Sequence, residues 1–391
     1  MSEPRSASVR QKLLERLQKK DALAFSEFLD IALYDPEAGY YTSGFAGVGR
    51  SGDFLTNVSM GPIYGLLLAR WLNDQFCNTP DFSKSAVILE QGANDGQLAE
   101  DILSELFKIN SEHDWNYWII EPSPVLQKRQ ADRLSRFGSS VRWFSDIEEL
   151  PDFCGIHISN ELIDALPFDL VERKNGQWME RYVCEEDENF TLRSFAATPE
   201  KSSPEFLKAL ARLPQNADFP EPYYSEIRPR QSLWLQKVAK KLQHGRILIC
   251  DYGYPLPIFY APWRKNGTLQ CYSQHKKNED PFQNIGRQDI SAHVDFTALA
   301  QDAQDAGFCV DGFSDQYHFL IRVGTNWLKS LEQGGLTPEV SKLLSAFKTL
   351  THPESMGTQF HYLTLSKNLP SPNPLLGFEP IARCREKLAL F

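Results

Sequence analysis

The chain has 391 residues, 42 % of them hydrophobic and 24 % charged, so it can bury a core, and its composition excludes a disordered or collagen-like polypeptide. Its 41 Lys and Arg residues are outnumbered by 51 Asp and Glu residues. The net charge of -10 argues against nucleic acid as the main ligand, because the field of the protein repels phosphates.

Residues 1–20 are expected to form an amphipathic helix. Six basic side chains accompany apolar residues at helical spacing, namely Val9, Leu13, Leu14 and Leu17. The segment lacks the apolar core of a secretory signal, and its two acidic residues are unusual for a transit peptide. We therefore expect a helix that packs on the protein body and begins a helical amino-terminal cap over residues 1–80.

Short apolar runs alternate with helical segments from residue 81 onward. A strand at 87–90, a glycine-containing turn and a helix over 98–107 are followed by a strand at 117–121 and a helix over 122–136. Further strands are expected at 141–144, 156–159 and 247–250. Helices between strands make parallel crossovers, so the sequence predicts an α/β protein with a sheet covered on both faces. Its two halves would span 81–166 and 231–314.

Residues 167–230, between these halves, have a weaker pattern that indicates an insertion. The insertion contains a hairpin-like stretch over 168–183 that turns at Asn175-Gly176. Residues 315–391 are expected to supply a helical cap, a final strand and a tail. The later elements are predicted as a helix over 296–306, a strand over 308–313, helical sequence over 315–355 and a strand over 359–366. We expect residues 1–80, the insertion and the later helices to cap one rim of the sheet.

Polar residues follow each predicted strand. In open α/β sheets ligands bind beyond the carboxyl ends of the strands, so these positions are the candidate site. They are Glu90, Glu121, Asp146, Asn160 with Glu161, and Asp251. The turn from Gly92 to Gly96 does not match the G-x-G-x-x-G pattern of dinucleotide sites. Acids on both sides of it suit a ligand that is cationic at one end and carries ribose hydroxyls at the other.

S-adenosylmethionine has this chemistry. Glu121 is placed for its carboxylate to accept both ribose hydroxyls, and Asp146 could reach the adenine amine. Gly92 and Gly96 would let the methionyl tail approach the backbone. A strand-end acid and a glycine-rich turn also occur in dinucleotide oxidoreductases, so these residues alone leave both classes open.

A series of motifs is similar to the MidA family, which includes the mitochondrial complex I assembly-factor arginine methyltransferase. The motifs run in the family order and comprise Ser51-Gly-Asp-Phe-Leu-Thr56, the turn from Glu90 to Gly96, Glu121 in an EPSP-L-Q context, Ser159-Asn-Glu-Leu-Ile-Asp-Ala-Leu-Pro167, Asp251-Tyr-Gly253, His275, and Asp289-Ile-Ser-Ala-His-Val-Asp-Phe296. The resemblance implies a Rossmann-like class I methyltransferase core with a seven-stranded, mostly parallel sheet, a helical amino-terminal cap and insertions.

The resemblance also implies the cofactor, the site and the partner. S-adenosyl-L-methionine would be held by Glu90, Gly92, Asn94, Gly96, Glu121, Asp146 and Asn160. In the characterised mitochondrial member, the substrate is an arginine on a quinone-module subunit of complex I. The resemblance therefore implies that this chain acts on a protein, and that the protein is similar to the complex I subunit.

The sequence departs from the family pattern at three positions. Asn94 replaces the middle glycine of the turn, and Ser59 and Leu66 stand where the family usually has glutamates. Asparagine tolerates left-handed backbone angles better than most residues, so the turn can survive the first change. The missing carboxylates leave a second hypothesis open, a catalytically impaired scaffold or assembly factor that binds the cofactor.

Carboxylates are the expected means of holding an arginine substrate. A guanidinium has a pKa above 12, so an arginine methyltransferase mainly orients the cation beside the methyl donor. The candidates for this role are Asp53, Glu161, Asp164 and Asp251, with Glu161 first because Asn160-Glu161 follows the fourth strand. Asp53 lies in the capping segment. His275 and His293 could accept a proton, or could serve only in structural hydrogen bonds.

Metal chemistry is not expected, because the sequence has no H-E-x-x-H motif or Cys/His cluster. The seven cysteines form no C-x-x-C pair, and their odd number favours a reducing compartment. We expect the bacterial cytoplasm, with the mitochondrial matrix as the alternative. No apolar run approaches the ~20 residues of a membrane helix, so membrane insertion is not expected. The oligomeric state is open between a monomer and a homodimer.

Overall fold

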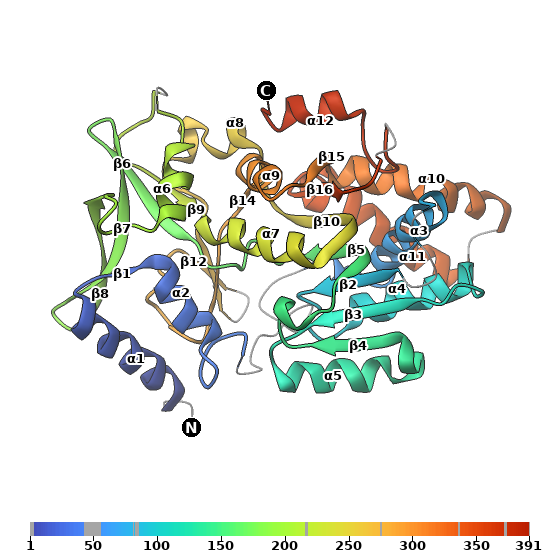
Figure 1. The fold of residues 1–391 in the computed structure, drawn as a ribbon, viewed down its shortest axis with the longest axis horizontal. Helices are drawn as coiled ribbons and strands as arrows, with labels where there is room; N and C mark the ends of the chain where they lie inside the picture. The colour runs from blue at the N-terminus through green and yellow to red at the C-terminus, as the bar shows by residue number, and fades with distance from the viewer. Residues whose placement is uncertain are drawn as a thin grey trace. The chain divides into compact units, whose positions relative to one another are not determined.

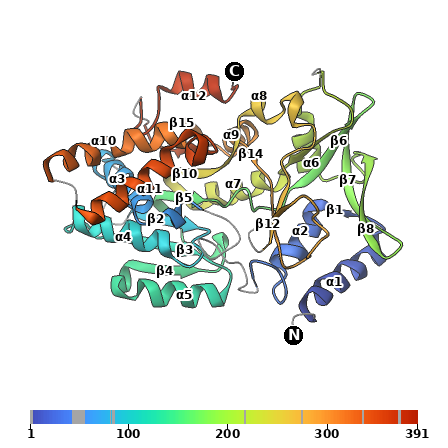
Figure 2. The same ribbon diagram turned by 180° about the vertical axis from the view of Figure 1, so that it is seen from behind.

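The chain divides into two units in a computed structural model that describes residues 4–42, 56–80, 82, 86–215, 218–273, 276–334, 337–370 and 374–390. We call them the antiparallel unit (Met1–Phe54, Ile163–Trp234 and Tyr254–Leu299) and the parallel unit (Leu55–Leu162, Leu235–Gly253 and Ala300–Phe391). Figure 1 shows the elements of both, and Figure 2 shows the same ribbon from behind.

The parallel unit is built on a sheet whose described strands lie in the order β15-β16-β10-β5-β2-β3-β4, a path of seven. Their bounds are β2 Val87–Gln91, β3 Asn116–Ile120, β4 Val141–Phe144, β5 Phe153–Asn160, β10 Leu242–Tyr254, β15 Cys309–Asp315 and β16 Phe360–Lys367. The five strands from β10 to β4 pair in parallel, and β16 pairs antiparallel with both β10 and β15. This confirms the expected seven-stranded, mostly parallel sheet.

Helices cover one face of this sheet with a continuous apolar core. Helices α3 (Ile63–Asn78), α4 (Gln97–Ile109), α10 (Gln316–Gly334) and α11 (Pro338–Thr351) contribute buried residues to the same cluster as β2, β3, β5, β10 and β16. Ile88, Ile119 and Ile158 of this cluster are at most 3 % exposed. The crossover after β3 is α5 (Pro124–Leu134), which begins with Ser123 as its amino-terminal cap and a proline in its first turn. The strands and helices predicted between residues 87 and 136 are therefore confirmed.

The register of the parallel strands brings their carboxyl ends to one edge. Gln91, the last residue of β2, pairs with Ile120 at the end of β3 and with Ser159 of β5. Asn160, the last residue of β5, pairs with Cys250 of β10. The residues that follow these positions, Glu121, Glu161 and Asp251, therefore share an edge of the sheet, as the sequence predicted.

The antiparallel unit contains two sheets. The larger has the order β1-β7-β6-β9 with β8 paired to β7, and the smaller has the order β12-β11-β13. Their bounds are β1 Leu23–Ala24, β6 Asp169–Lys174, β7 Gln177–Glu186, β8 Asn189–Ala196, β9 Tyr223–Ile227, β11 Gln270–Ser273, β12 Lys276–Asn278 and β13 Asp289–Ser291. The remaining strand is β14 (Val294–Asp295).

The hairpin predicted to turn at Asn175-Gly176 is confirmed, since β6 and β7 flank those two residues and both have positive φ, 52° and 74°. The insertion contains more regular structure than its sequence pattern indicated. Strand β8 has one buried residue, Phe190, so its sequence lacks the clear apolar alternation that would have predicted it. Its helix α6 (Pro204–Ala211) and strand β9 complete this region.

The amino-terminal helix α1 (Pro4–Lys20) packs as its apolar spacing predicted. Val9, Leu13 and Leu17 are at most 4 % exposed and belong to one core with residues of α2 (Phe25–Tyr34). The other described helices are α7 Pro229–Lys241, α8 Leu256–Phe259, α9 Phe296–Asp305 and α12 Ile381–Lys387. In the described ranges, none of the helices has both the length and the apolarity that a bilayer crossing demands.

Candidate functional site

The turn after β2 is built from residues with unusual backbone angles. Gly92, Asn94 and Gly96 all have positive φ, at 84°, 47° and 83°, and Gly96 caps the amino terminus of α4. Asn94 thus adopts the left-handed conformation that its glycine counterpart in the family would permit, so the substitution does not prevent this turn from forming. A Cβ atom at Gly92 would lie 3.3 Å from the Leu162 side chain, so the turn lies close to the segment after β5.

Glu121 lies at the end of β3 with a carboxylate held by its own loop and by α5. Its Oε1 accepts a hydrogen bond from Ser123 N at 2.9 Å, and its Oε2 accepts one from Gln130 Nε2 at 3.1 Å. Burial raises the pKa of Glu121, and these two hydrogen bonds oppose the shift. Each carboxylate oxygen can accept more than one hydrogen bond, so both retain capacity for a ligand hydroxyl.

Glu90 is a buried carboxyl group within β2 rather than a residue that follows it. Its side chain is 2 % exposed and its Oε2 accepts a hydrogen bond from the Tyr117 hydroxyl at 2.7 Å. Desolvation raises the pKa of Glu90 to about 7, although the Tyr117 hydrogen bond acts in the opposite direction. Near neutral pH this group can therefore be present in either protonation state.

Asn160 and Glu161 form a polar cluster at the end of β5. Glu161 Oε1 accepts hydrogen bonds from Asn160 Nδ2 at 3.0 Å and from Asn57 N at 3.1 Å. Asn160 Oδ1 accepts from the hydroxyl of Tyr64 at 2.6 Å, and the Tyr362 hydroxyl lies 3.1 Å from that of Tyr64. The side chains of β5, α3 and β16 thus fix the orientation of the Asn160 amide.

The backbone of Glu161 is unusual for a residue with a side chain. Its φ is 54°, a conformation that costs a non-glycine residue roughly 1–2 kcal/mol. Its N–H donates to Cys250 O at 2.9 Å, which ties the strained position to β10. Non-glycine residues with such backbone angles concentrate at functional sites.

Asp251 is fully buried beside this cluster. Its Oδ2 accepts from Leu162 N at 3.2 Å, and its Oδ1 accepts from Tyr252 N at 2.8 Å. These contacts attach the residue after Glu161 to β10.

The remaining predicted residues are placed elsewhere or lie outside the described ranges. Asp146 is exposed and accepts a hydrogen bond from Glu148 N at 2.8 Å, so it caps a short 3-10 helix. Asp164 belongs to the antiparallel unit, where it accepts from Ala165 N at 2.9 Å. His293 belongs to the same unit, and its N–H donates to the Thr268 hydroxyl at 3.0 Å. Asp53 and His275 lie outside the described residues.

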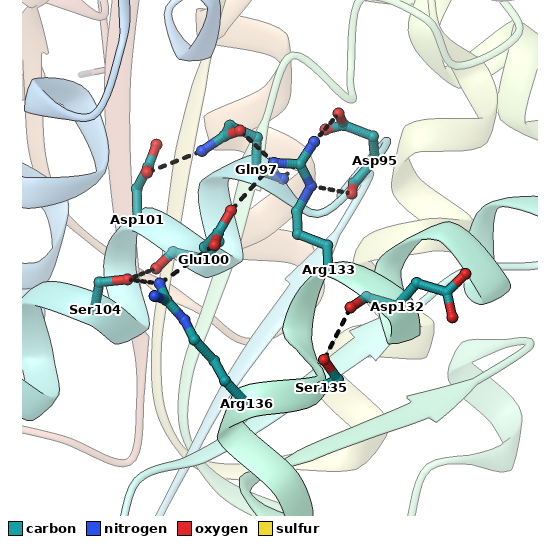
Figure 3. Close-up of polar contacts among 9 residues, drawn as sticks. All are labelled: Asp95, Gln97, Glu100, Asp101, Ser104, Asp132, Arg133, Ser135 and Arg136. Atoms are coloured by element: carbon teal, nitrogen blue, oxygen red, sulfur yellow. Dashed lines mark hydrogen bonds and ion pairs between the residues drawn. The ribbon is translucent and has the colours of Figure 1, made fainter.

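An ion-pair network formed by Arg133 of α5 and Arg136, two residues beyond its end, joins the glycine turn and α4 to this part of the chain (Figure 3). Arg133 donates from Nε to Asp95 O at 3.0 Å and pairs with the Asp95 carboxylate at 2.7 Å. It also pairs with Glu100 of α4 at 3.1 Å, and Arg136 pairs with the same carboxylate at 3.3 Å. The start of α4 is thereby tied to α5.

Comparison with known proteins identifies the family. The sequence profile of a family described as "Putative S-adenosyl-L-methionine-dependent methyltransferase" matches residues 67–314. The chain belongs to this methyltransferase family. The match confirms the predicted resemblance and cofactor, and it decides against the dinucleotide oxidoreductase that the strand-end acids alone left open.

Relatives and solved structures cover nearly the whole chain. The protein arginine methyltransferase NDUFAF7 homolog, mitochondrial, of Drosophila melanogaster is 25 % identical over 399 residues, 95 % of this chain and 88 % of the relative. The Homo sapiens protein arginine methyltransferase NDUFAF7, mitochondrial, is 24 % identical over 380 residues, 90 % of this chain and 82 % of the relative.

A crystal structure of a Burkholderia thailandensis protein bound to S-adenosyl-homocysteine superposes with a TM-score of 0.83. It has 28 % sequence identity and covers 95 % of this chain and 94 % of that chain. The agreement confirms that this methyltransferase family shares the fold described above.

The residues at the strand ends fit S-adenosylmethionine. Gly92 and Gly96 have no side chains and so leave the backbone of the turn open to a ligand, and the buried Glu121 carboxylate retains capacity to accept further hydrogen bonds. Within the described residues, no group of three His, Cys, Asp or Glu side chains has the arrangement of a metal site.

Sequence reasoning did not single out Asn57, Tyr64, Tyr117 or Gln130. Tyr64 and Tyr117 lie in apolar runs, where an aromatic residue is normally read as core. Gln130 did carry a signal, because it is spaced four residues from both Leu126 and Leu134 and so stands on the apolar side of α5. A buried amide on an apolar helix face needs hydrogen-bond partners, and these are the glycine turn and Glu121.

Proposed function

We propose that this enzyme transfers a methyl group to an arginine side chain of a partner protein, and that Glu161 binds the guanidinium. The observation that carries the proposal is the position of Glu161, which follows β5 immediately before Leu162, the residue that faces Gly92 of the cofactor turn. A substrate held at Glu161 would lie beside a cofactor held at that turn. The names of the relatives, protein arginine methyltransferases at 24–25 % identity, support the choice of arginine.

The chemistry requires orientation more than proton removal. When bound, S-adenosylmethionine supplies a methyl group on a positively charged sulfur. A guanidinium nitrogen forms the new bond to carbon while the carbon–sulfur bond breaks, and the methylated guanidinium releases one proton. Because free arginine stays protonated at neutral pH, a carboxylate contributes by holding the cation and aligning one nitrogen with the methyl group.

The neighbours of Glu161 support this role. Hydrogen bonds from Asn57 N and Asn160 Nδ2 to the same oxygen fix the direction of the carboxylate. Asp251 acts in this proposal through Leu162, because its described hydrogen bonds go to backbone N–H groups. The other roles expected from the sequence stay predictions. They are direct contacts of the substrate with Asp53, Asp164 or Asp251, a contact of adenine with Asp146, and proton transfer to His275 or His293.

The proposed partner follows the family resemblance, so a quinone-module subunit of complex I is the first protein to test. For the compartment, the proposal stays with the expectation from the cysteine pattern of the sequence, the bacterial cytoplasm or alternatively the mitochondrial matrix.

Mass spectrometry of the candidate subunit, incubated with enzyme and S-adenosylmethionine, tests the proposal. We expect an added methyl group on arginine, its loss in Glu161→Gln, and normal cofactor binding by that variant. Glu112→Gln is the matched control, because Glu112 is exposed and precedes the amino end of β3. Methylation by Glu161→Gln at the wild-type rate would refute the assigned role. Cofactor binding without transfer to any tested partner would favour the scaffold hypothesis instead.

A further inference from the structure

Gln130 is a completely buried residue of α5 that joins the two sides of the cofactor site. Its Nε2 donates to Asn94 O at 2.7 Å and to Glu121 Oε2 at 3.1 Å. Its Oε1 accepts from Trp143 Nε1 at 3.0 Å. An indole N–H can only donate and a backbone carbonyl can only accept, so these partners determine which end of the amide is nitrogen.

The two acceptors of this one amide group belong to different loops. Asn94 is the non-glycine residue of the turn after β2, whose φ is 47°, and Glu121 follows β3. Gly96 of the same turn also packs on Gln130, since a Cβ at Gly96 would lie 3.4 Å from Gln130 Cα. The buried Gln130 side chain therefore fixes the distance between the Asn94 carbonyl and the Glu121 carboxylate.

We propose that Gln130 is a positioning residue for the cofactor, which sets the glycine turn and the Glu121 carboxylate to match the methionyl and ribose parts of one ligand. This inference rests on the proposed role of Glu121 in binding the ribose hydroxyls. The neighbouring Arg133 donates to the next carbonyl of the turn, that of Asp95 (Figure 3). The described contacts of Arg133 go to Asp95, Gln97 and Glu100, and not to Glu121. Gln130 is thus the link between turn and carboxylate within the described residues.

The consequence is specific to the ribose hydroxyls. Without the Gln130 donor, Glu121 loses one of the two hydrogen bonds that fix its carboxylate and should accept the hydroxyls in a less favourable geometry. A hydrogen bond to a charged group that is lost in this way weakens binding by about tenfold or more. A ligand without those hydroxyls should be affected much less.

Calorimetric titration with S-adenosyl-homocysteine and with its 2′,3′-dideoxy analogue tests the inference. For the wild type we expect a clear preference for the hydroxylated ligand. Gln130→Met should bind that ligand about tenfold more weakly and lose most of the preference. Lys128→Met is the matched control, because it places the same new side chain on the same helix and removes only an exposed ion pair with Asp132. We expect this control to retain the preference.

Gln130→Glu provides a second test that keeps the shape of the side chain. The introduced carboxyl group lies beside Glu121, so at neutral pH the two charges repel and binding should weaken. As the pH falls, one shared proton restores a hydrogen bond, and affinity should recover.

The outcomes separate the inference from the proposed function. If Glu121→Ala retains the wild-type affinity and preference, the assignment of Glu121 to the ribose is wrong and this inference falls with it. If Glu121→Ala loses the preference while Gln130→Met and Gln130→Glu keep it, only the positioning role of Gln130 is refuted. If the Glu121 and Gln130 variants all lose it, the inference is supported.

Discussion

Replacing Glu90 with glutamine removes a carboxyl group from β2. The Glu90 side chain is only 2 % exposed and is hydrogen-bonded to Tyr117. In the folded protein, desolvation raises the pKa of this group from 4.5 to about 7. Between these two values the folded state holds a proton that the unfolded state has released. The contribution of Glu90 to stability is therefore fully present below pH 4.5 and is lost as the pH rises through about 7.

The size of this loss follows from the shift. A difference of about 2.5 pKa units corresponds to about 3 kcal/mol, at about 1.4 kcal/mol per unit. Glutamine cannot ionise, so the free energy of unfolding of Glu90→Gln should rise relative to wild type by about this amount between pH 4 and pH 8. The substitution also changes the free energy of unfolding by an amount that does not depend on pH. This amount cancels when the difference between variant and wild type at pH 8 is compared with that at pH 4.

Urea denaturation of both proteins across this pH range is the measurement. The wild-type curve alone is not sufficient, because burial lowers the pKa of His157 to about 3 and gives the opposite slope between about pH 3 and 6.5. Taking the difference between variant and wild type removes the His157 contribution. A difference that stays constant from pH 4 to pH 8 would refute the reasoning, since it would mean that folding does not perturb Glu90.

Three further predictions concern binding, backbone strain and a buried ion pair. Affinity for cationic S-adenosylmethionine should rise as the pH passes through about 7 and Glu90 ionises, and calorimetry on Glu90→Gln should show no such rise. Gly155→Ala places a Cβ 2.0 Å from a backbone oxygen of β2, so thermal melting should show a loss above about 4 kcal/mol. Gly176→Ala, which has a positive φ in the hairpin turn but open space around its Cβ, should lose only about 1–2 kcal/mol. Arg246→Met removes the cation from a buried pair with Asp311 and should cost about 3–5 kcal/mol in urea denaturation, much of which Arg246→Met with Asp311→Leu should restore.

Local patterns predicted the elements that form the core of the methyltransferase. Three parts of the core have short-range signals, namely the run 87–90, the turn from Gly92 to Gly96 and the following helix. These signals are apolar spacing, glycine and asparagine at the turn, and helical periodicity after Gly96. The same holds for the hairpin at Asn175-Gly176. Parallel crossovers then require that the strand ends share one edge, so Glu121 and Glu161 could be placed there before the structure was known.

Burial of polar groups could not be predicted in the same way. The sequence presented Glu90 as one more acid at a strand end, whereas the structure places it within β2, where loss of solvent raises its pKa. Asp146 had the same pattern and is exposed, with its carboxylate used to cap a short helix. The difference between them depends on which residues pack above each strand end, and this is decided by segments distant in the sequence.

Periodicity and turn chemistry act over a few residues, so the amino-acid sequence was sufficient to predict the α/β class and the order of the polar strand ends. The choice of cofactor needed the resemblance to a family as well. How the strand ends are tied together depends on the folded protein. The contact of Gln130 with Asn94 spans 36 residues, and that of Glu161 with Asn57 spans 104. Such hydrogen bonds form only when separate elements meet, since their geometry depends on the packing of the whole sheet and its helices.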